Sequence, residues 1–293
     1  MDTLVQDIIS ALALGSLYAI YALPIALLFG VMRLINFAHG ELIMVAGFAL
    51  YLSRDLGLAS ILVALVACVV VALMTERVAF RPLRDANAST LLISSFAASF
   101  VLQNLAFVIF GSLPKTFSIA DWMLESVSIW GIDVSWLVIL TIASALVWFV
   151  LLALFLERTT LGIKMRAAAE DFNMARMCGI PANLVIAIAF SITAALAVTG
   201  AFFLTMRSGA VSPSIGIEPV VLGFVATVIG GLGSLRGAIA GAYLLGGLTV
   251  LFQVMLSGTI LDFRDALVYG VVFLVLVLRP EGILGTATPE GRA

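Results

Sequence analysis

The residues best suited to chemistry in this sequence form one short block, Asn36, His39 and Glu41, at the start of an apolar stretch. Ionisable side chains that lie within a membrane segment are costly and usually functional, so the block is a candidate for a transport path. An equally good interpretation is a polar network that locks this segment against the preceding one, with Glu41 paired to His39 or Arg33. Both interpretations stay open at this point.

Further polar residues are candidates for the same path. Gln103, Asn104 and Gln253 are amides within apolar runs, where they suit either a passing polar solute or hydrogen bonds between helices. Glu218 precedes Pro219 after a Ser-Pro-rich stretch. That pattern fits a broken helix whose free end faces the path, or a turn at the outer surface.

Enzyme chemistry is not expected of this chain. The single histidine and the two distant cysteines, Cys68 and Cys178, cannot assemble a closed zinc site. Nothing near His39 suggests an activated nucleophile. A phosphate-binding loop needs a lysine in a glycine-rich pattern, and neither Lys115 nor Lys164 has one. We therefore expect no cofactor in this chain, and any ATP must be handled by another chain.

The composition indicates a protein embedded in lipid. Of the 293 residues, 63% are apolar and only 11% are charged, whereas soluble domains are roughly 45–50% apolar and about 25% charged. Ordinary cytosolic enzymes, disordered chains and nucleic-acid binders are thereby excluded. The formal net charge of −2 is also too small to attract a polyanion.

Runs without Asp, Glu, Lys or Arg predict the membrane spans. Because unpaired backbone groups are costly in hydrocarbon, we predict an all-α, polytopic transmembrane helical bundle of eight to nine spans. The runs 219–235 and 266–278 are short, and either suits a half-helix or a re-entrant segment. Residues 34–53 are apolar except near their start. The nine candidate runs are 8–32, 34–53, 56–75, 86–114, 134–156, 177–206, 219–235, 237–261 and 266–278.

The basic residues predict the orientation. With the N-terminus outside, the outer loops hold only Arg54, Lys115, Arg207 and Arg264, and all the other basic residues fall inside. The positive-inside rule therefore favours an N-outside, C-inside arrangement. We treat residues 1–293 as a single transmembrane domain. Its two longer connections are an outer segment, 112–133, with aromatic anchors, and a cytoplasmic loop, 157–181.

The cytoplasmic loop has a helix-forming composition. A helix over about 164–177 places Ala168 and Ala175 near one face, with Met165 and Met177 as further exposed apolar side chains. An amphipathic helix on lipid headgroups is one interpretation. We favour the other, a helix that docks into a groove on a cytoplasmic protein.

Four stretches of the sequence resemble one family. They are RLINFAHGELIMVAGF at 33–48, GSLYAIYAL at 15–23, RAAAEDFNMARMCGI at 166–180 and VIGGLGSLRGAIAGAYLLG at 228–246. They are similar to the membrane-spanning subunits of branched-chain amino acid ABC importers. The resemblance implies a multi-pass permease of the bacterial inner membrane. It also implies a sister permease as partner, two ATPase subunits holding ATP and magnesium, and an extracytoplasmic binding protein.

The same resemblance assigns a role to the alanine-glutamate loop. In the family this loop is the coupling helix that fits the ATPase. The positions that match it are Ala168, Ala169, Glu170, Asp171, Ala175 and Gly179.

Small residues recur near the C-terminal end of the sequence. Gly233, Gly237 and Gly241 repeat at four-residue spacing, and Ala242 and Gly246 follow. Such a pattern lets helix backbones approach closely in lipid. We predict that these glycines serve helix packing, within the chain or between two permeases.

The expected function is transport of branched-chain or similar neutral amino acids by an ATP-driven importer. A zwitterion has no net charge, so a path with few fixed charges could pass it. The nearest alternative is an importer of urea or short-chain amides. A second alternative is an ion-coupled secondary transporter that uses His39 and Glu41 as a proton relay.

Overall fold

The structure is a computed structural model that describes residues 2–32, 36–83, 86–129, 132–170, 172–256, 258–279 and 282–284. This part of the chain is mainly helical, and the prediction of an all-α membrane protein is confirmed. The α-helices are α1 Asp2–Met32, α2 His39–Leu52, α3 Ser60–Thr75, α4 Ala88–Phe110, α5 Trp136–Arg158, α6 Thr160–Glu170, α7 Phe172–Met177, α8 Ala182–Ser208, α9 Ile217–Gly230, α10 Leu235–Met255 and α11 Arg264–Leu278.

Short elements connect these helices. Two small antiparallel sheets lie at one end of the bundle, where β1 (Lys115–Thr116) pairs with β4 (Ala210–Val211) and β2 (Ser126–Ile129) pairs with β3 (Ile132–Ser135). The short 3-10 helices are η1 Arg54–Ala59, η3 Arg81–Leu83, η4 Asp121–Leu124 and η5 Gly258–Phe263, and η2 Glu76–Phe80 is a π-helix. The predicted outer segment 112–133 therefore contains β1, η4, β2 and the start of β3 in its described part.

Six helices in the described ranges are long and apolar enough to cross a membrane. All nine predicted runs contain a helix, but α2 and α9 have 14 residues and α11 has 15. Such helices reach only about 21–23 Å, whereas the hydrocarbon core is about 30 Å thick. The six long spans are Leu4–Met32, Arg54–Leu83, Ala88–Phe110, Trp136–Arg158, Asn183–Ser208 and Leu235–Met255.

Helices α2 and α9 contact each other at the residues where they begin. A Cβ atom on Gly216 would overlap the carbonyl oxygen of Gly40, and one on Gly40 would lie 2.5 Å from the carbonyl oxygen of Gly216. Only glycine permits backbones this close. Pro219 favours the start of α9, because its missing N–H falls in the first helical turn, where the amides have no helical acceptor.

The chain contains an internal repeat in which α1–α4 correspond to α8–α11. Helix α1 ends at Met32 and α8 at Ser208, an offset of 176 positions, and α4 and α11 begin at Ala88 and Arg264 with the same offset. The offset also aligns identical residues, since the motif Val-x-Gly-Phe occurs at both 45–48 and 221–224. Leu-Gly likewise occurs at both 56–57 and 232–233.

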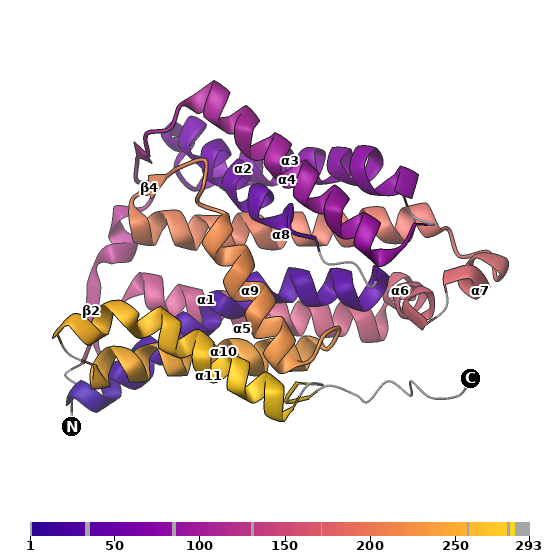
Figure 1. Cartoon of the computed structure of the whole chain (residues 1–293). Helices are drawn as coiled ribbons and strands as arrows, with labels where there is room; N and C mark the ends of the chain where they lie inside the picture. The colour runs from indigo at the N-terminus through magenta and orange to yellow at the C-terminus, as the bar shows by residue number, and fades with distance from the viewer. Residues whose placement is uncertain are drawn as a thin grey trace.

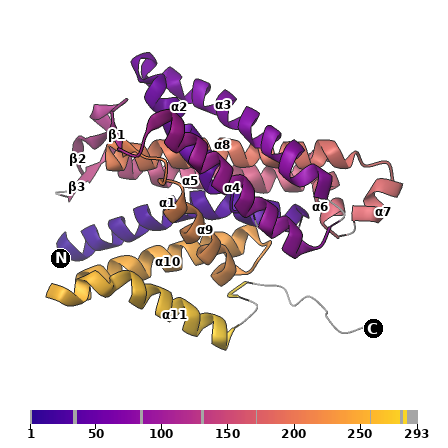
Figure 2. The same cartoon turned by 45° about the horizontal axis from the view of Figure 1, so that its top comes forward.

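The contacts between helices follow the same repeat. Helix α2 packs against α8 and α3, and its counterpart α9 packs against α1 and α10. The central pair α1 and α8 run in opposite directions, with α2, α3 and α4 on one side and α10 and α11 on the other (Figures 1 and 2). The two halves are therefore inverted relative to each other, as in many transporters.

The core lies along α1 and α8. In a membrane-length stretch of α1 and of α8, 78% and 61% of the residues are buried, whereas in α4 the buried share is 11%. The strongly apolar helices α3, α4 and α5 therefore expose most of their surface. Because apolar surface of this extent is unfavourable in water, lipid or other subunits must cover it.

Glycines bring the helices of the second half close together. A Cβ atom on Gly237 or Gly241 would overlap the backbone of α9, and one on Gly246 would lie 2.5 Å from the backbone nitrogen of Gly15 in α1. Gly233 lies in the turn between α9 and α10 at φ 84°, a left-handed conformation that glycine adopts without strain. Three of the four predicted packing glycines therefore join backbones within this chain.

Candidate functional site

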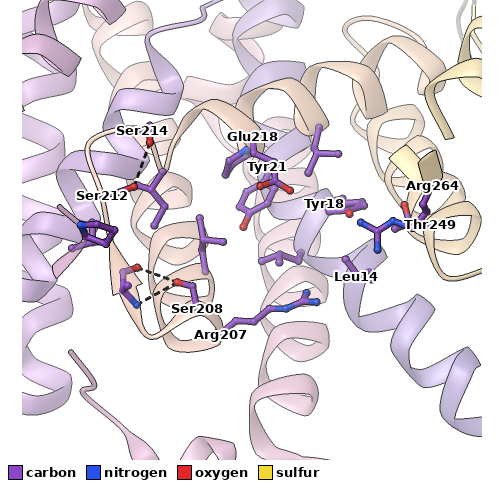
Figure 3. Close-up of a pocket in the computed structure, with 18 of the residues that line it drawn as sticks. Leu14, Tyr18, Tyr21, Arg207, Ser208, Ser212, Ser214, Glu218, Thr249 and Arg264 are labelled. Atoms are coloured by element: carbon purple, nitrogen blue, oxygen red, sulfur yellow. Dashed lines mark hydrogen bonds between the residues drawn. The ribbon is translucent and has the colours of Figure 1, made fainter. Parts of the chain in front are cut away.

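A cavity of about 630 Å³ opens at the end of the bundle that carries β4, between α1, α8, α9, α10 and α11 (Figures 1 and 3). Its walls combine leucine side chains with hydroxyl, amide and charged groups. The lining residues are Leu14, Leu17, Tyr18, Tyr21, Pro114, Leu204, Arg207, Ser208, Ala210, Val211, Ser212, Ser214, Ile215, Glu218, Pro219, Leu222, Thr249, Gln253 and Arg264.

Helix α1 supplies one wall of the cavity. Leu14, Leu17, Tyr18 and Tyr21 follow at three- and four-residue spacing, so they share one face of the helix. The hydroxyl oxygen of Tyr21 is buried and has no hydrogen-bond partner among the described residues. A buried hydroxyl is normally hydrogen-bonded, so this one is available to a bound polar molecule.

Three charged side chains reach the cavity from three helices. Arg207 comes from the last turn of α8, Glu218 from the first turn of α9 and Arg264 from the start of α11. Arg264 is compensated, because its Nη2 lies 2.9 Å from Oδ1 of Asp265 and its Nη1 donates to Oε1 of Gln253 at 3.4 Å. Within the described ranges, neither Glu218 nor Arg207 forms an ion pair.

The predicted block at the start of α2 lies in a closed environment. Asn36, His39 and Glu41 are all buried, with exposed fractions of 4%, 1% and 3%. Oε1 of Glu41 accepts a hydrogen bond of 2.8 Å from the Ser99 hydroxyl in α4. Glu41 is therefore held by α4, and the expected pairing with His39 is not formed. The other expected partner, Arg33, lies outside the described residues.

Several polar atoms of this block remain unpaired. Oδ1 of Asn36, both ring nitrogens of His39 and Oε2 of Glu41 are buried without a hydrogen-bond partner in the part of the chain that the structure describes. Buried polar atoms are costly when left unpaired, which argues against a purely structural network. Gly40 lies within this block, and Gly216, which it contacts, lies between the cavity-lining residues Ile215 and Glu218.

The amides of α4 lie away from the cavity. Asn104 is exposed, and its Nδ2 donates to the carbonyl oxygen of Phe100 in the same helix at 2.7 Å. Gln103 is half-buried and does not line the cavity. Of the three amides, only Gln253 contributes to the wall.

Sequence reasoning missed most polar residues of the cavity as site candidates, among them Tyr18, Tyr21, Arg207 and Arg264. The charge pattern predicts that both arginines lie on the outer side. One interpretation of Glu218 also places it in a turn at the outer surface. This predicted common location of three charged residues was the signal from which the charged part of the site could have been found. The tyrosines gave no comparable signal, because aromatic residues are ordinary in an apolar helix.

The predicted coupling helix is divided in the structure. Helix α6 ends at Glu170 and α7 begins at Phe172, and Asp171 between them lies outside the described residues. Met165, Ala168 and Ala175 are buried within the chain, so the expectation that they form an exposed apolar face is wrong. A Cβ atom on Gly162 would overlap the end of α5, and this close approach turns the apolar face of α6 inward.

A different surface of this loop is exposed. Arg166, Glu170, Met174 and Met177 are exposed, as is Gly179, whereas Ala169 is half-buried. Helices α6 and α7 lie at the end of the molecule opposite to β4 and the cavity (Figure 1). The exposed surface is thus mixed, with methionine side chains beside charged groups of both signs.

Comparison with known proteins gives consistent relatives. A family described as "Branched-chain amino acid transport system / permease component" matches residues 8–278. The high-affinity branched-chain amino acid transport system permease protein BraD of Pseudomonas aeruginosa is 34% identical and covers 97% of both chains. The corresponding protein LivH of Escherichia coli K12 is 31% identical over 97% of this chain and 96% of its own.

A solved structure shares the fold at low sequence similarity. PsaBC from Streptococcus pneumoniae in complex with Fab has a TM-score of 0.53 and 15% identity, over 93% of this chain and 91% of that one. The likeness concerns the fold alone. Together with the match over residues 8–278, the inverted repeat and the relatives of similar length place the chain: it belongs to the family of branched-chain amino acid transport system permease components.

Proposed function

We propose that this chain is the permease subunit of an ATP-driven ABC importer that moves branched-chain or similar neutral amino acids across the bacterial inner membrane. The family match over residues 8–278 is the observation that supports this most strongly. ATP and magnesium are held by two separate ATPase subunits, and an extracytoplasmic binding protein delivers the solute. A sister permease completes the pathway.

The proposed topology has nine crossings with the N-terminus outside. Helices α2 and α9 are half-helices, and each crossing is completed by the chain that leads to it, residues 36–38 and 212–216. This arrangement keeps the basic side chains of α6 and α7 on the cytoplasmic side. It also places the cavity on the outer side, where a binding protein can release its solute.

The proposed path runs from the cavity, past Gly216 and Gly40, to the block of Asn36, His39 and Glu41. The unpaired polar atoms of the block support this assignment, since a hydrated path would supply their hydrogen bonds. Gln103 and Asn104 are weaker candidates, because neither lines the cavity. Alternating access would then open the outer and inner sides in turn.

The energy source tests this proposal first. Right-side-out vesicles or proteoliposomes that contain the whole complex should take up leucine only with ATP inside and the binding protein outside. We expect vanadate to abolish uptake and a protonophore to leave it unchanged. Uptake that a protonophore abolishes and vanadate spares would favour the ion-coupled alternative, in which His39 and Glu41 relay protons. Uptake of urea without any uptake of leucine would favour the amide importer.

Coupling to the ATPase is proposed to occur at the exposed surface of α6 and α7, at Glu170 and its neighbours. Glu170→Lys reverses one charge on this surface, so ATP hydrolysis should continue while leucine uptake falls by about tenfold or more. Glu125→Lys is the matched control, because Glu125 is also exposed but lies at the opposite end. Normal uptake by Glu170→Lys would contradict the coupling role.

A further inference from the structure

We infer that the cavity at the start of α9 binds the α-amino acid as a zwitterion, with Glu218 facing the ammonium group and Arg207 facing the carboxylate. The inference rests on the proposed function and deepens it. It states that the permease holds the solute itself during transport and recognises the two charges that all α-amino acids share.

The charges of the cavity match this ligand. Arg264 is already compensated by Asp265, which leaves one carboxylate and one guanidinium without a charged partner among the described residues. Glu218 and Arg207 belong to different helices and lie above and below the ring of Tyr21 in the view of Figure 3. The inference places the ammonium group of one small molecule at Glu218 and its carboxylate at Arg207.

The same pair argues against an uncharged solute. Urea or a short amide carries no charge to offset either Glu218 or Arg207. A ligand that carries both charges can form charge-assisted hydrogen bonds with both side chains, and these are stronger than the bonds of a neutral ligand.

The Tyr21 hydroxyl is the second observation that indicates a ligand. Its oxygen is buried, it has no hydrogen-bond partner in the described part of the chain, and it belongs to the cavity lining. In Figure 3 the ring of Tyr21 lies between Glu218 and Arg207. The hydroxyl can donate to the carboxylate of a ligand held there.

The size of the cavity determines what it can select. Its volume of about 630 Å³ lies within the range of about 300–1,000 Å³ found for small-molecule sites. Leu14, Leu17, Leu204 and Leu222 give the cavity an apolar surface that suits aliphatic side chains. The cavity should therefore accept neutral α-amino acids broadly, and finer selection belongs to the binding protein.

Protection of a cysteine tests binding in the complete transporter. Ser214 lines the cavity and is exposed, so Ser214→Cys in a Cys178→Ser background should react with a membrane-impermeant thiol reagent. Leucine should slow this reaction, in the absence of binding protein, by about tenfold at saturation. The analogues 4-methylpentanoate and 3-methylbutylamine each lack one of the two charges and should not protect. Equal protection by either analogue would overturn the inference.

Charge removal tests the two assigned residues. Glu218→Gln and Arg207→Gln should each abolish protection by leucine and lower ATP-driven leucine uptake by about tenfold, roughly one charged hydrogen bond. Glu218→Asp and Arg207→Lys should retain more of both. Arg54→Gln and Asp121→Asn are matched controls, because these charges lie outside the cavity lining. ATP hydrolysis in all variants shows that the complex is assembled.

The outcomes separate this inference from the proposed function. Normal leucine uptake by both Glu218→Gln and Arg207→Gln, with no protection by leucine, would overturn the zwitterion site and leave the importer intact. A complex that never takes up leucine would contradict the proposed function instead. If a charge variant does not assemble, the comparison of leucine with its two analogues on the Ser214→Cys chain still decides.

Discussion

The starts of α2 and α9 occupy equivalent positions in the inverted repeat, yet their surroundings differ. Glu218, at the start of α9, is exposed in a cavity of about 630 Å³. Asn36, His39 and Glu41, at the start of α2, are each less than 5% exposed. One polar helix start is open to a cavity, and its counterpart is enclosed by protein.

Both helix starts carry a glutamate and a glycine that contacts the other half. In the structure the start of α9 is open to the cavity and the start of α2 is closed. In transporters with inverted repeats, the two halves can exchange their environments between the two access states.

The largest expected effect is at the contact between the two helix starts. Gly216→Ala forces a Cβ into the carbonyl oxygen of Gly40, so we expect destabilisation at or above the upper end of the roughly 1–3 kcal/mol seen for overpacking. Leucine uptake should be lost. Gly247→Ala is the control, because a Cβ there meets nothing within 4 Å. Thermal unfolding of the purified complex measures the stability of both variants. Equal stability of Gly216→Ala and Gly247→Ala would refute the contact.

The next largest effect concerns accessibility. Without ATP, Ser214→Cys should react with an impermeant thiol reagent at least about ten times faster than Ala38→Cys, because cysteine reactivity follows exposure and Ala38 is buried. A Cys178→Ser background removes the exposed native cysteine. Reaction of Ala38→Cys should rise when the complex is trapped in its inward-facing state. A rate that is the same in both states would mean that α2 never opens.

A smaller effect is expected at the hydrogen bond that closes the block. Ser99→Ala removes the donor to Oε1 of Glu41 and leaves a buried carboxylate oxygen unpaired, which should cost about 1–3 kcal/mol. Ser144→Ala serves as the control, since that hydroxyl donates only within its own helix, to the carbonyl oxygen of Thr141. The thermal unfolding temperature should fall clearly for Ser99→Ala and little for Ser144→Ala. The reverse order would show that Ser99 does not hold Glu41.

The smallest effect is expected on α4. Asn104→Ala alters an exposed side chain that bonds within its own helix, so leucine uptake should change by less than about twofold. Gln253→Ala removes a side chain that lines the cavity and accepts a hydrogen bond from Arg264, so it should lower leucine uptake more. A strong loss for Asn104→Ala with none for Gln253→Ala would move the path toward α4.

The helices were predictable from the sequence because a single property, the absence of charge, defines a run that must be helical in lipid. The length of α9 was recognised as short. What the runs could not reveal was that α2 and α9 meet, because that contact depends on packing between residues far apart in the sequence.

The candidate site was predictable only in part. Glu218 stood out as a charge beside a proline, and the charge pattern predicts that Arg207 and Arg264 lie on the same side of the membrane. Tyr21 became a candidate only when its hydroxyl was seen to be buried without a partner. The exposed face of α6 was misjudged, because periodicity shows that a helix has an apolar face but not that its own bundle covers that face.

The barrier between Gly40 and Gly216 is built from main chain alone. Side-chain substitutions at a barrier of this kind cannot reshape it gradually, since even one added methyl group collides with a peptide carbonyl. In the proposed importer, relatives that carry other nutrients would then have to differ in the residues that line the cavity and in their binding proteins, while the contact between α2 and α9 stays unchanged.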